Sequence, residues 1–319
     1  MTTSLEMGKA QSLLKRLWDN YSIVLVTLLI IAICSILAPR FLPINNLMAI
    51  ARNSAVIGMI ALGMTFVIIG GGIDLSAGHV VATGGAVLII LQANPEIPIP
   101  LAIAAGIGTC LAISTISGII ITKANLQPFI VTLAIGIMAR SITMYICRGS
   151  TILGRNVPEF TTLGMGSVGF VPIPLIIFIV FAVALSFVLK YTKFGSYVYA
   201  VGGNENAARY SGINVHRVRL YTYILLGFCI GIAGTIDFSR MAAVSASTSG
   251  YLYEFDAITA VVIGGTSLAG GRGRIMGTVM GVIILGIVSN ILIMLNMSPF
   301  LAGAVKGVII LIAVLLQKR

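Results

Sequence analysis

The sequence predicts an all-α polytopic membrane protein. Of its 319 residues, 58% are hydrophobic and only 9% are charged, whereas about a quarter of the residues in a soluble domain are charged. A soluble fold of this length could not hide so much apolar surface, so the chain belongs in a bilayer. Long apolar runs, interrupted by charges or by Pro and Gly, supply the helices. We expect one transmembrane domain over residues 1–319.

The apolar runs predict about ten membrane helices, because a helix needs about 20 apolar residues to cross a bilayer. The uncharged stretch 275–305 is too long for one helix, and a turn at 295–299 divides it. Segment 256–266 is too short to span alone, so the total is approximate. In chain order, the expected helices lie near residues 21–38, 53–72, 76–92, 100–121, 128–147, 172–189, 219–238, 256–266, 275–295 and 300–316.

The N-terminal segment resembles a signal peptide, because Lys9, Lys15 and Arg16 precede the apolar run 20–39. That run is too long for the apolar part of a cleaved signal, and many spans follow it. We therefore expect a cytoplasmic tail at 1–19, followed by the first membrane helix.

The distribution of basic residues predicts that both termini are cytoplasmic. Ten helices place both termini on one side, and the inner segments then hold thirteen Lys and Arg against five outside. Basic residues gather in cytoplasmic loops, so this also explains the net charge of +11 without a nucleic-acid partner. The inner residues are Lys9, Lys15, Arg16, Lys123, Lys190, Lys193, Arg209, Arg217, Arg219, Arg272, Arg274, Lys318 and Arg319, and the outer ones are Arg40, Arg52, Arg148, Arg155 and Arg240.

The loops are too small to hold a soluble domain. The largest outer segment is 148–171, and the main inner loop is 190–218. If ligand capture or nucleotide hydrolysis is needed, another polypeptide must perform it.

The inner loop 190–218 contains a short, capped, charged helix. Asn204 is a good N-cap, and Glu205 places a negative charge at the positive end of the helix dipole. Gly212 suits a left-handed stop. About two turns are too short to be stable in water, so the rest of the chain or a docked partner must hold them.

Two glycine-rich stretches, "VIIGGGIDLSAG" (67–78) and "VVIGGTSLAGGRGR" (261–274), share a pattern and suggest a faint internal repeat. Such breaks in apolar segments are tolerated where protein or a water-filled cavity meets the backbone. Neither stretch is a phosphate loop, because G-x-x-x-x-G-K-[ST] is absent from the chain. Three GxxxG pairs predict close helix packing: Gly227/Gly231, Gly277/Gly281 and Gly303/Gly307.

Ionisable residues inside the spans are few and must face protein or water. Arg140 and Lys306 either form structural pairs or line a path, and Asp237 can pair with Arg240 three residues later. The candidate path or gating residues are Gly71, Gly72, Asp74, Ser76, Arg140, Gly264, Gly265, Thr266 and Lys306.

Two classes of function find little support in the sequence. An intramembrane enzyme lacks support, because the two histidines and four cysteines have no metal-ligand spacing and no nucleophile has a nearby base. We assign no catalytic residue and no metal site. An ion-coupled carrier usually carries an acidic residue at mid-membrane, and Asp74, the only candidate, is expected near the inner surface.

Four ordered segments resemble the membrane permeases of bacterial sugar ABC importers, the ribose, xylose, arabinose and galactose group. The resemblance covers roughly residues 20–316. The segments are "PRFLPINNL" (39–47), "GMTFVIIGGGIDLSAG" (63–78), "GGNENAARYSGINV" (202–215) and "YEFDAITAVVIGGTSLAGGRGRIMGT" (253–278).

This resemblance implies a multi-pass protein of the bacterial inner membrane with a fold similar to the vitamin B12-type importer permeases. It implies that the short inner helix is a coupling helix that docks on a separate ATPase subunit, which binds the ATP and Mg, so that this chain binds no cofactor. Its residues would be Asn204, Glu205, Asn206, Ala207, Ala208, Arg209 and Gly212, with Asn206 standing where alanine is common. An extracytoplasmic sugar-binding protein and a second permease copy or paralogue complete the implied assembly, which moves a ribose-like pentose or a hexose inward.

Overall fold

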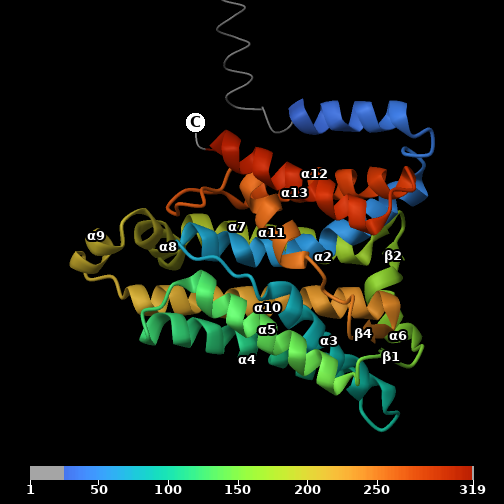
Figure 1. Cartoon of the computed structure of the whole chain (residues 1–319), viewed down its shortest axis with the longest axis horizontal. Coiled ribbons are helices and arrows are strands. Elements are labelled where there is room, and N and C mark those ends of the chain that lie inside the picture. The colour runs from blue at the N-terminus through green and yellow to red at the C-terminus, as the bar shows by residue number, and fades with distance from the viewer. Residues whose placement is uncertain (1–24, 318–319) are drawn as a thin grey trace, which may run out of the picture.

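The computed structural model describes residues 25–317 as a bundle of long helices joined by short loops (Figure 1). The first apolar helix is described from Leu25 to Leu37, and its expected start and the tail at 1–19 lie outside the described residues. Each of the ten expected segments overlaps a helix. The remaining helices are α2 (Ile44–Ile69), α3 (Ala77–Ala93), α4 (Ile99–Lys123), α5 (Pro128–Ile146), α6 (Pro158–Met165), α7 (Ile173–Tyr191), α8 (Lys193–Gly203), α9 (Glu205–Tyr210), α10 (Val215–Met241), α11 (Tyr253–Ile263), α12 (Ile275–Met294) and α13 (Pro299–Gln317).

Two very short strand pairs interrupt the helical pattern. β1 (Thr151–Leu153) pairs antiparallel with β4 (Ala243–Ser245), and β2 (Ser167–Val168) pairs with β3 (Val171–Pro172). The sequence did not predict them, because strands of two or three residues carry almost no periodic signal. The first pair joins the loop after α5 to the loop after α10, and the second pair lies between α6 and α7.

Six helices within residues 25–317 are long and apolar enough to cross a membrane: α2, α4, α5, α7, α10 and α12. This supports an all-α polytopic membrane protein. The figure of about ten crossings stays a prediction.

Helices α2 and α10 form the centre of the bundle. Within the most apolar part of each helix, 83% of the residues of α2 and 67% of those of α10 are buried. α10 packs against α4 and α2, while α2 also packs against α7, α11 and α12. The outer helices α4, α5 and α7 bury at most a third of the residues in this part. Their exposed Leu, Ile, Val and Phe side chains form an apolar outer surface of the kind expected in a bilayer.

Two of the three GxxxG pairs pack as predicted. A Cβ at Gly227 would lie 2.6 Å from the Ser114 Cβ, and one at Gly231 would lie 2.8 Å from the Ile107 Cα, so α10 meets α4 closely. Gly277 and Gly281 abut α11 in the same way.

The third pair, Gly303/Gly307, has no close backbone neighbour among the described residues, so its packing stays a prediction. A Cβ at Gly307 would meet no described atom within 4 Å, and one at Gly303 would only touch the Leu252 side chain at 4.0 Å.

Several helix boundaries differ from the prediction because polar residues find partners inside helices. α2 begins at Ile44 rather than near 53, and the Arg52 guanidinium donates a 3.0 Å hydrogen bond to the carbonyl of Met165. α10 begins at Val215, where Asn214 caps it by accepting from the Arg217 N–H at 3.0 Å. α11 ends at Ile263, so residues 264–266 form a turn.

The turn predicted at 295–299 is confirmed. α12 ends at Met294, α13 begins at Pro299, and Asn296 between them adopts a φ of 53°.

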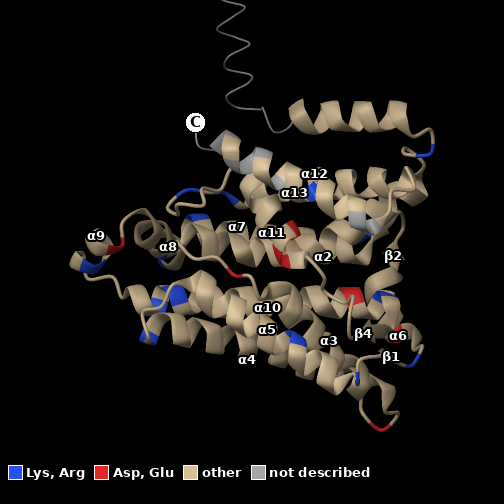
Figure 2. Ribbon diagram, in the orientation of Figure 1, with Lys and Arg blue, Asp and Glu red and all other residues tan. Residues whose placement is uncertain are grey.

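The two ends of the bundle are different. Figure 1 shows α8 and α9 at one end and α6, β1 and β4 at the other. Lys and Arg lie on α9, at the start of α10, at the ends of α4 and α7 and before α12, all at the α8–α9 end (Figure 2). This arrangement agrees with the assignment of the α8–α9 end to the cytoplasm.

Candidate functional site

Helix α9 begins as the sequence predicted. The side-chain oxygen of Asn204 accepts a 3.0 Å hydrogen bond from the backbone N–H of Ala207, and Glu205 occupies the first turn. An N-cap of this kind stabilises a helix by about 1 kcal/mol. The first residue of the helix is therefore defined by local chemistry.

The end of α9 is equally well defined. Gly212 has a φ of +79°. Its N–H donates to the carbonyl of Arg209 at 3.0 Å, and the N–H of Ile213 donates to the carbonyl of Ala208 at 3.1 Å. This pair of bonds is the Schellman motif, in which glycine takes the left-handed position. The predicted left-handed stop at Gly212 is confirmed.

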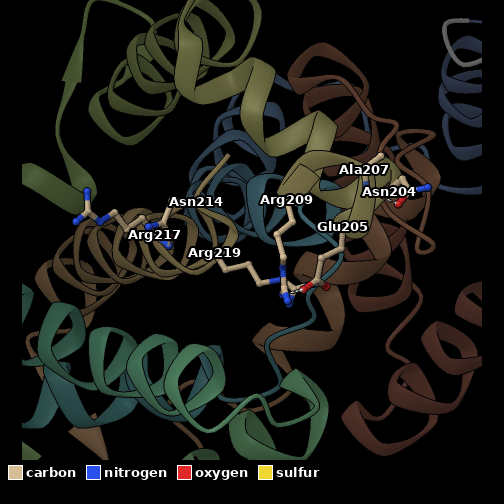
Figure 3. Close-up of polar contacts among 7 residues, drawn as sticks. All are labelled: Asn204, Glu205, Ala207, Arg209, Asn214, Arg217 and Arg219. Carbon is tan, nitrogen blue, oxygen red and sulfur yellow. Dashed lines mark hydrogen bonds and ion pairs between the residues drawn. The ribbon is translucent and has the colours of Figure 1, made fainter. Parts of the chain in front are cut away.

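Glu205 holds α9 against α10. Its carboxylate accepts from Arg209 one turn later at 2.9 Å and from Arg219 on α10 at 2.6 Å. Figure 3 shows both arginines converging on Glu205, while Arg217 points away from them. Ion pairs this open to solvent add little stability, so the pair chiefly fixes the direction in which α9 points.

One face of α9 is buried and the other is open. Ala208 packs inward, whereas Asn206, Ala207 and Arg209 are exposed. Tyr210 is 91% exposed at the last turn. Sequence reasoning missed Tyr210, since nothing in its immediate neighbours tells whether a tyrosine at this turn faces inward or outward.

Helix α8, which the sequence analysis read as loop, connects α9 to the bundle. Thr192 caps it by accepting from the Gly195 N–H at 3.2 Å. The Tyr199 hydroxyl donates a 2.7 Å hydrogen bond to the carbonyl of Gly273, in the segment before α12. Burial raises the pKa of Tyr199, so the hydroxyl keeps its proton and remains a donor.

The two glycine-rich stretches end their helices in the same way. After α2, the Gly71 N–H donates to Ile68 and the Gly72 N–H to Val67. After α11, the corresponding donors are Gly265, which bonds to Val262, and Thr266, which bonds to Val261. Gly71 and Gly265 have φ values of +81° and +83°. The repeat suggested by the sequence is therefore confirmed for these two helix ends.

These stretches meet the end of α8 in a cluster that we call the glycine junction, formed by Ile69, Gly71, Gly202, Gly270 and Gly271. The Gly271 N–H donates to the carbonyl of Ile69 at 2.8 Å. A Cβ at Gly202 would collide with that carbonyl, and one at Gly270 would lie 2.7 Å from the carbonyl of Gly202. Only glycine permits three backbones to lie this close.

Asp74 and Ser76 lie in the connection between α2 and α3 and are fully buried. One carboxylate oxygen of Asp74 accepts from both the N–H and the hydroxyl of Ser76 at 2.6 Å. The other has no hydrogen-bond partner among the described residues. The backbone beside them is satisfied by side chains from two other helices, because Thr132 of α5 bonds to the N–H of Leu75 and Tyr223 of α10 to the carbonyl of Ile73.

Arg140 and Lys306, the two basic residues predicted inside the spans, both have polar partners. Arg140 donates to the backbone carbonyls of Ser247 and Ser249, and Lys306 pairs with Asp256 at 2.7 Å. The predicted pair of Arg240 with Asp237 is confirmed at 3.2 Å. The turn after α11 is formed by Gly264, Gly265 and buried Thr266. Among the described residues, no group of three or more His, Cys, Asp or Glu is placed to hold a metal ion.

Comparisons with known proteins agree with one another. Residues 46–314 match the family described as "Branched-chain amino acid transport system / permease component". The chain is 39% identical to the ribose import permease protein RbsC of Escherichia coli (strain K12), over 100% of this chain and 99% of that protein. It is 43% identical to RbsC of Bacillus subtilis (strain 168), over 91% and 90%. It is 34% identical to the D-allose transport system permease protein AlsC of Escherichia coli (strain K12), over 94% and 92%. No solved structure matches the chain.

Proposed function

This chain belongs to the permease family that its residues 46–314 match, and on that premise we propose that it is the transmembrane subunit of an ATP-driven ABC importer for a ribose-like monosaccharide. It is a multi-pass protein of the cytoplasmic membrane. The relatives that it matches over nearly their whole length are named as ribose and D-allose permeases. Both solutes are neutral aldoses, and Arg240 and Lys306 inside the bundle are each paired with a carboxylate, which leaves neither free to attract an anion.

The single observation that carries the coupling role is the construction of α9. Both of its ends are fixed by capping bonds, and Glu205 ties it to α10. Its outer face is left open, with Asn206, Ala207, Arg209 and Tyr210 exposed. Two capped ends and a fixed orientation in so short a helix indicate that its orientation matters for function. We assign the open face to the groove of an ATPase subunit, where Tyr210 is the anchor, since tyrosine is enriched at interface hot spots.

The glycine junction provides the route by which motion of α9 reaches the bundle. α8 and α9 are consecutive, and Gly202 at the end of α8 touches the end of α2 and the segment before α12. Tyr199 adds a direct bond to that segment. When the partner ATPase domains close on ATP and Mg, α8 and α9 move with them and bias the bundle between inward- and outward-facing arrangements. This chain supplies no catalytic group to that cycle.

The rest of the assembly follows from the same proposal. An extracytoplasmic sugar-binding protein delivers the solute to the end that carries β1 and β4, and a second permease copy or a paralogue completes the pathway. We propose about ten crossings in a vitamin B12-importer-like fold, with both termini cytoplasmic. The path and gating residues remain Gly71, Gly72, Asp74, Ser76, Arg140, Gly264, Gly265, Thr266 and Lys306.

The test is reconstitution of this chain with its ATPase and binding protein in liposomes, followed by measurement of D-ribose uptake. Uptake that needs ATP and all three components supports the proposal. The alternative is an ion-coupled carrier or facilitator, and the unpartnered oxygen of buried Asp74 is the observation in its favour. Accumulation of D-ribose by the lone chain, driven by an ion gradient without nucleotide, would replace our proposal with that alternative.

A further inference from the structure

A cavity of about 190 Å³ with both apolar and polar lining lies among α2, α10, α11, α12 and α13, toward the end of the bundle opposite α9. We call it the outer cavity. The first half of α2, the last turn of α10 and the first turn of α11 all contribute side chains to its wall. Its polar lining comes chiefly from Ser54, Asp237, Arg240, Tyr253, Asp256 and Lys306. Such a lining is unusual inside an apolar bundle, where polar groups are costly and mark functional sites.

The charges of the outer cavity cancel. Arg240 pairs with Asp237 at 3.2 Å, and Lys306 pairs with Asp256 at 2.7 Å. Tyr253 donates its hydroxyl proton to the second oxygen of Asp237 at 2.9 Å. Two acids and two bases leave no net charge, so an anion or a cation that entered would find no uncompensated partner. Fixed donors and acceptors without net charge suit a neutral, hydroxyl-rich ligand.

The cavity also contains a polar group without a partner. The Ser54 side chain is buried, with Ser54 only 7% exposed, and its hydroxyl makes no hydrogen bond to any described residue. A Cβ at Gly286 on α12 would collide with that hydroxyl, so glycine there leaves Ser54 room. A buried hydroxyl that lacks a partner is destabilising. This oxygen is closed off from solvent and lies against Gly286, so it belongs to the wall of the cavity.

We propose that the outer cavity binds one neutral monosaccharide within the membrane part of the importer. This rests on the proposed function and names the contact that the solute makes with this chain. A volume of 190 Å³ exceeds that of a few waters at about 30 Å³ each and is below the several hundred Å³ of drug-sized sites. Sugar hydroxyls donate to Asp256 and accept from Arg240 and Lys306, whose side chains are partly exposed. The Tyr253 ring offers an apolar surface to the C–H face of the sugar.

The test is saturation-transfer NMR on the full chain in lipid nanodiscs, with millimolar D-ribose as the probe. We expect transfer from the wild-type chain and its loss in Ser54→Leu, which fills the cavity. Ser186→Leu is the matched control, because it makes the same change on the lipid-facing helix α7 and must keep the signal. The double variant Asp256→Asn, Lys306→Met keeps the cavity neutral and its side chains similar in size. It weakens D-ribose binding about tenfold through lost charge-assisted hydrogen bonds.

Two results would overturn the proposal. One is the absence of D-ribose transfer from a folded wild-type chain. The other is equal transfer from wild type and from both cavity variants. Equal transfer to choline or gluconate would disprove the neutral-ligand assignment. Failure here is distinct from failure of the proposed function, because ATP-dependent uptake in liposomes is measured separately. ATP-dependent uptake of D-ribose without binding in the cavity would disprove the cavity proposal alone. D-ribose binding together with uptake that does not need ATP would disprove the ATP-coupled importer alone.

Discussion

The backbone N–H of Gly271 donates a 2.8 Å hydrogen bond to the carbonyl oxygen of Ile69. These residues are some two hundred positions apart. Ile69 is the last residue of α2, and Gly271 lies in the segment between α11 and α12. Gly202 lies against both of them, so that the last turn of α8 bridges the end of α2 and the segment before α12. The bond therefore joins the two glycine-rich stretches at the place where α9 is attached.

This contact predicts that Gly202→Ala uncouples the importer. The new Cβ would collide with the Ile69 carbonyl and lie 2.7 Å from the Gly271 nitrogen, so the junction must separate. We expect ATP-dependent D-ribose uptake in proteoliposomes to fall at least about tenfold, since overpacking costs about 1–3 kcal/mol. Gly203→Ala is the control, because its Cβ would meet no described atom within 4 Å. Equal loss in both variants would contradict the role of the junction.

The backbone conformation of Gly212 predicts different effects for two substitutions at this position. Its φ of +79° is unfavourable for a β-branched residue by about 1–2 kcal/mol, whereas asparagine tolerates it. Gly212→Val should leave the chain in the membrane but reduce ATPase binding and uptake, and Gly212→Asn should retain both. Co-purification of the ATPase with the tagged permease measures the first effect. Normal binding by Gly212→Val would show that α9 does not need its C-terminal cap to dock.

Tyr210 tests docking without disturbing the fold. Because the side chain is 91% exposed, Tyr210→Ala should not change the thermal stability of the isolated chain. If Tyr210 anchors α9 in the ATPase, Tyr210→Ala weakens the binding free energy between the two subunits by at least about 2 kcal/mol, the threshold for a hot spot. Tyr145→Ala on α5 is the control, since that tyrosine is 86% exposed on another helix. An unchanged affinity in Tyr210→Ala would place the anchor elsewhere.

Glu205 separates orientation from charge. It accepts from Arg209 and Arg219, so Glu205→Lys would place three basic side chains together and turn α9 away from α10. We expect uptake to be lost in Glu205→Lys with the chain still in the membrane. Glu205→Gln keeps hydrogen-bond acceptance and should retain most uptake, because exposed ion pairs contribute only about 0–1 kcal/mol. Full uptake by Glu205→Lys with normal ATPase assembly would argue against the docking of α9.

The sequence predicted what depends on neighbouring residues. Asn204 and Gly212 act on bonds within a few positions, so their capping roles were readable in advance. The Glu205–Arg219 pair was not, because it depends on the angle at which α9 returns to α10. The outer cavity was even less accessible, since Ser54, Asp256 and Lys306 come from three helices and meet only in the folded bundle. Of these three, only Lys306 was noticed, as a charge in an apolar run, and the Asp237–Arg240 pair was predicted without its connection to the cavity.

Asp74 decides between the importer and the ion-coupled carrier. One of its oxygens accepts from the N–H and hydroxyl of Ser76, while the other has no partner among the described residues. A carrier that works by protonation of Asp74 would lose all uptake in Asp74→Asn, since an amide does not titrate. In the importer, the amide oxygen of asparagine still accepts from Ser76, so we expect ATP-dependent uptake to persist within about a factor of three. Asp74→Leu, which removes both hydrogen bonds and costs about 1–3 kcal/mol, should lower the amount of folded chain. Abolished uptake in Asp74→Asn, with a normal amount of protein in the membrane, would favour the carrier.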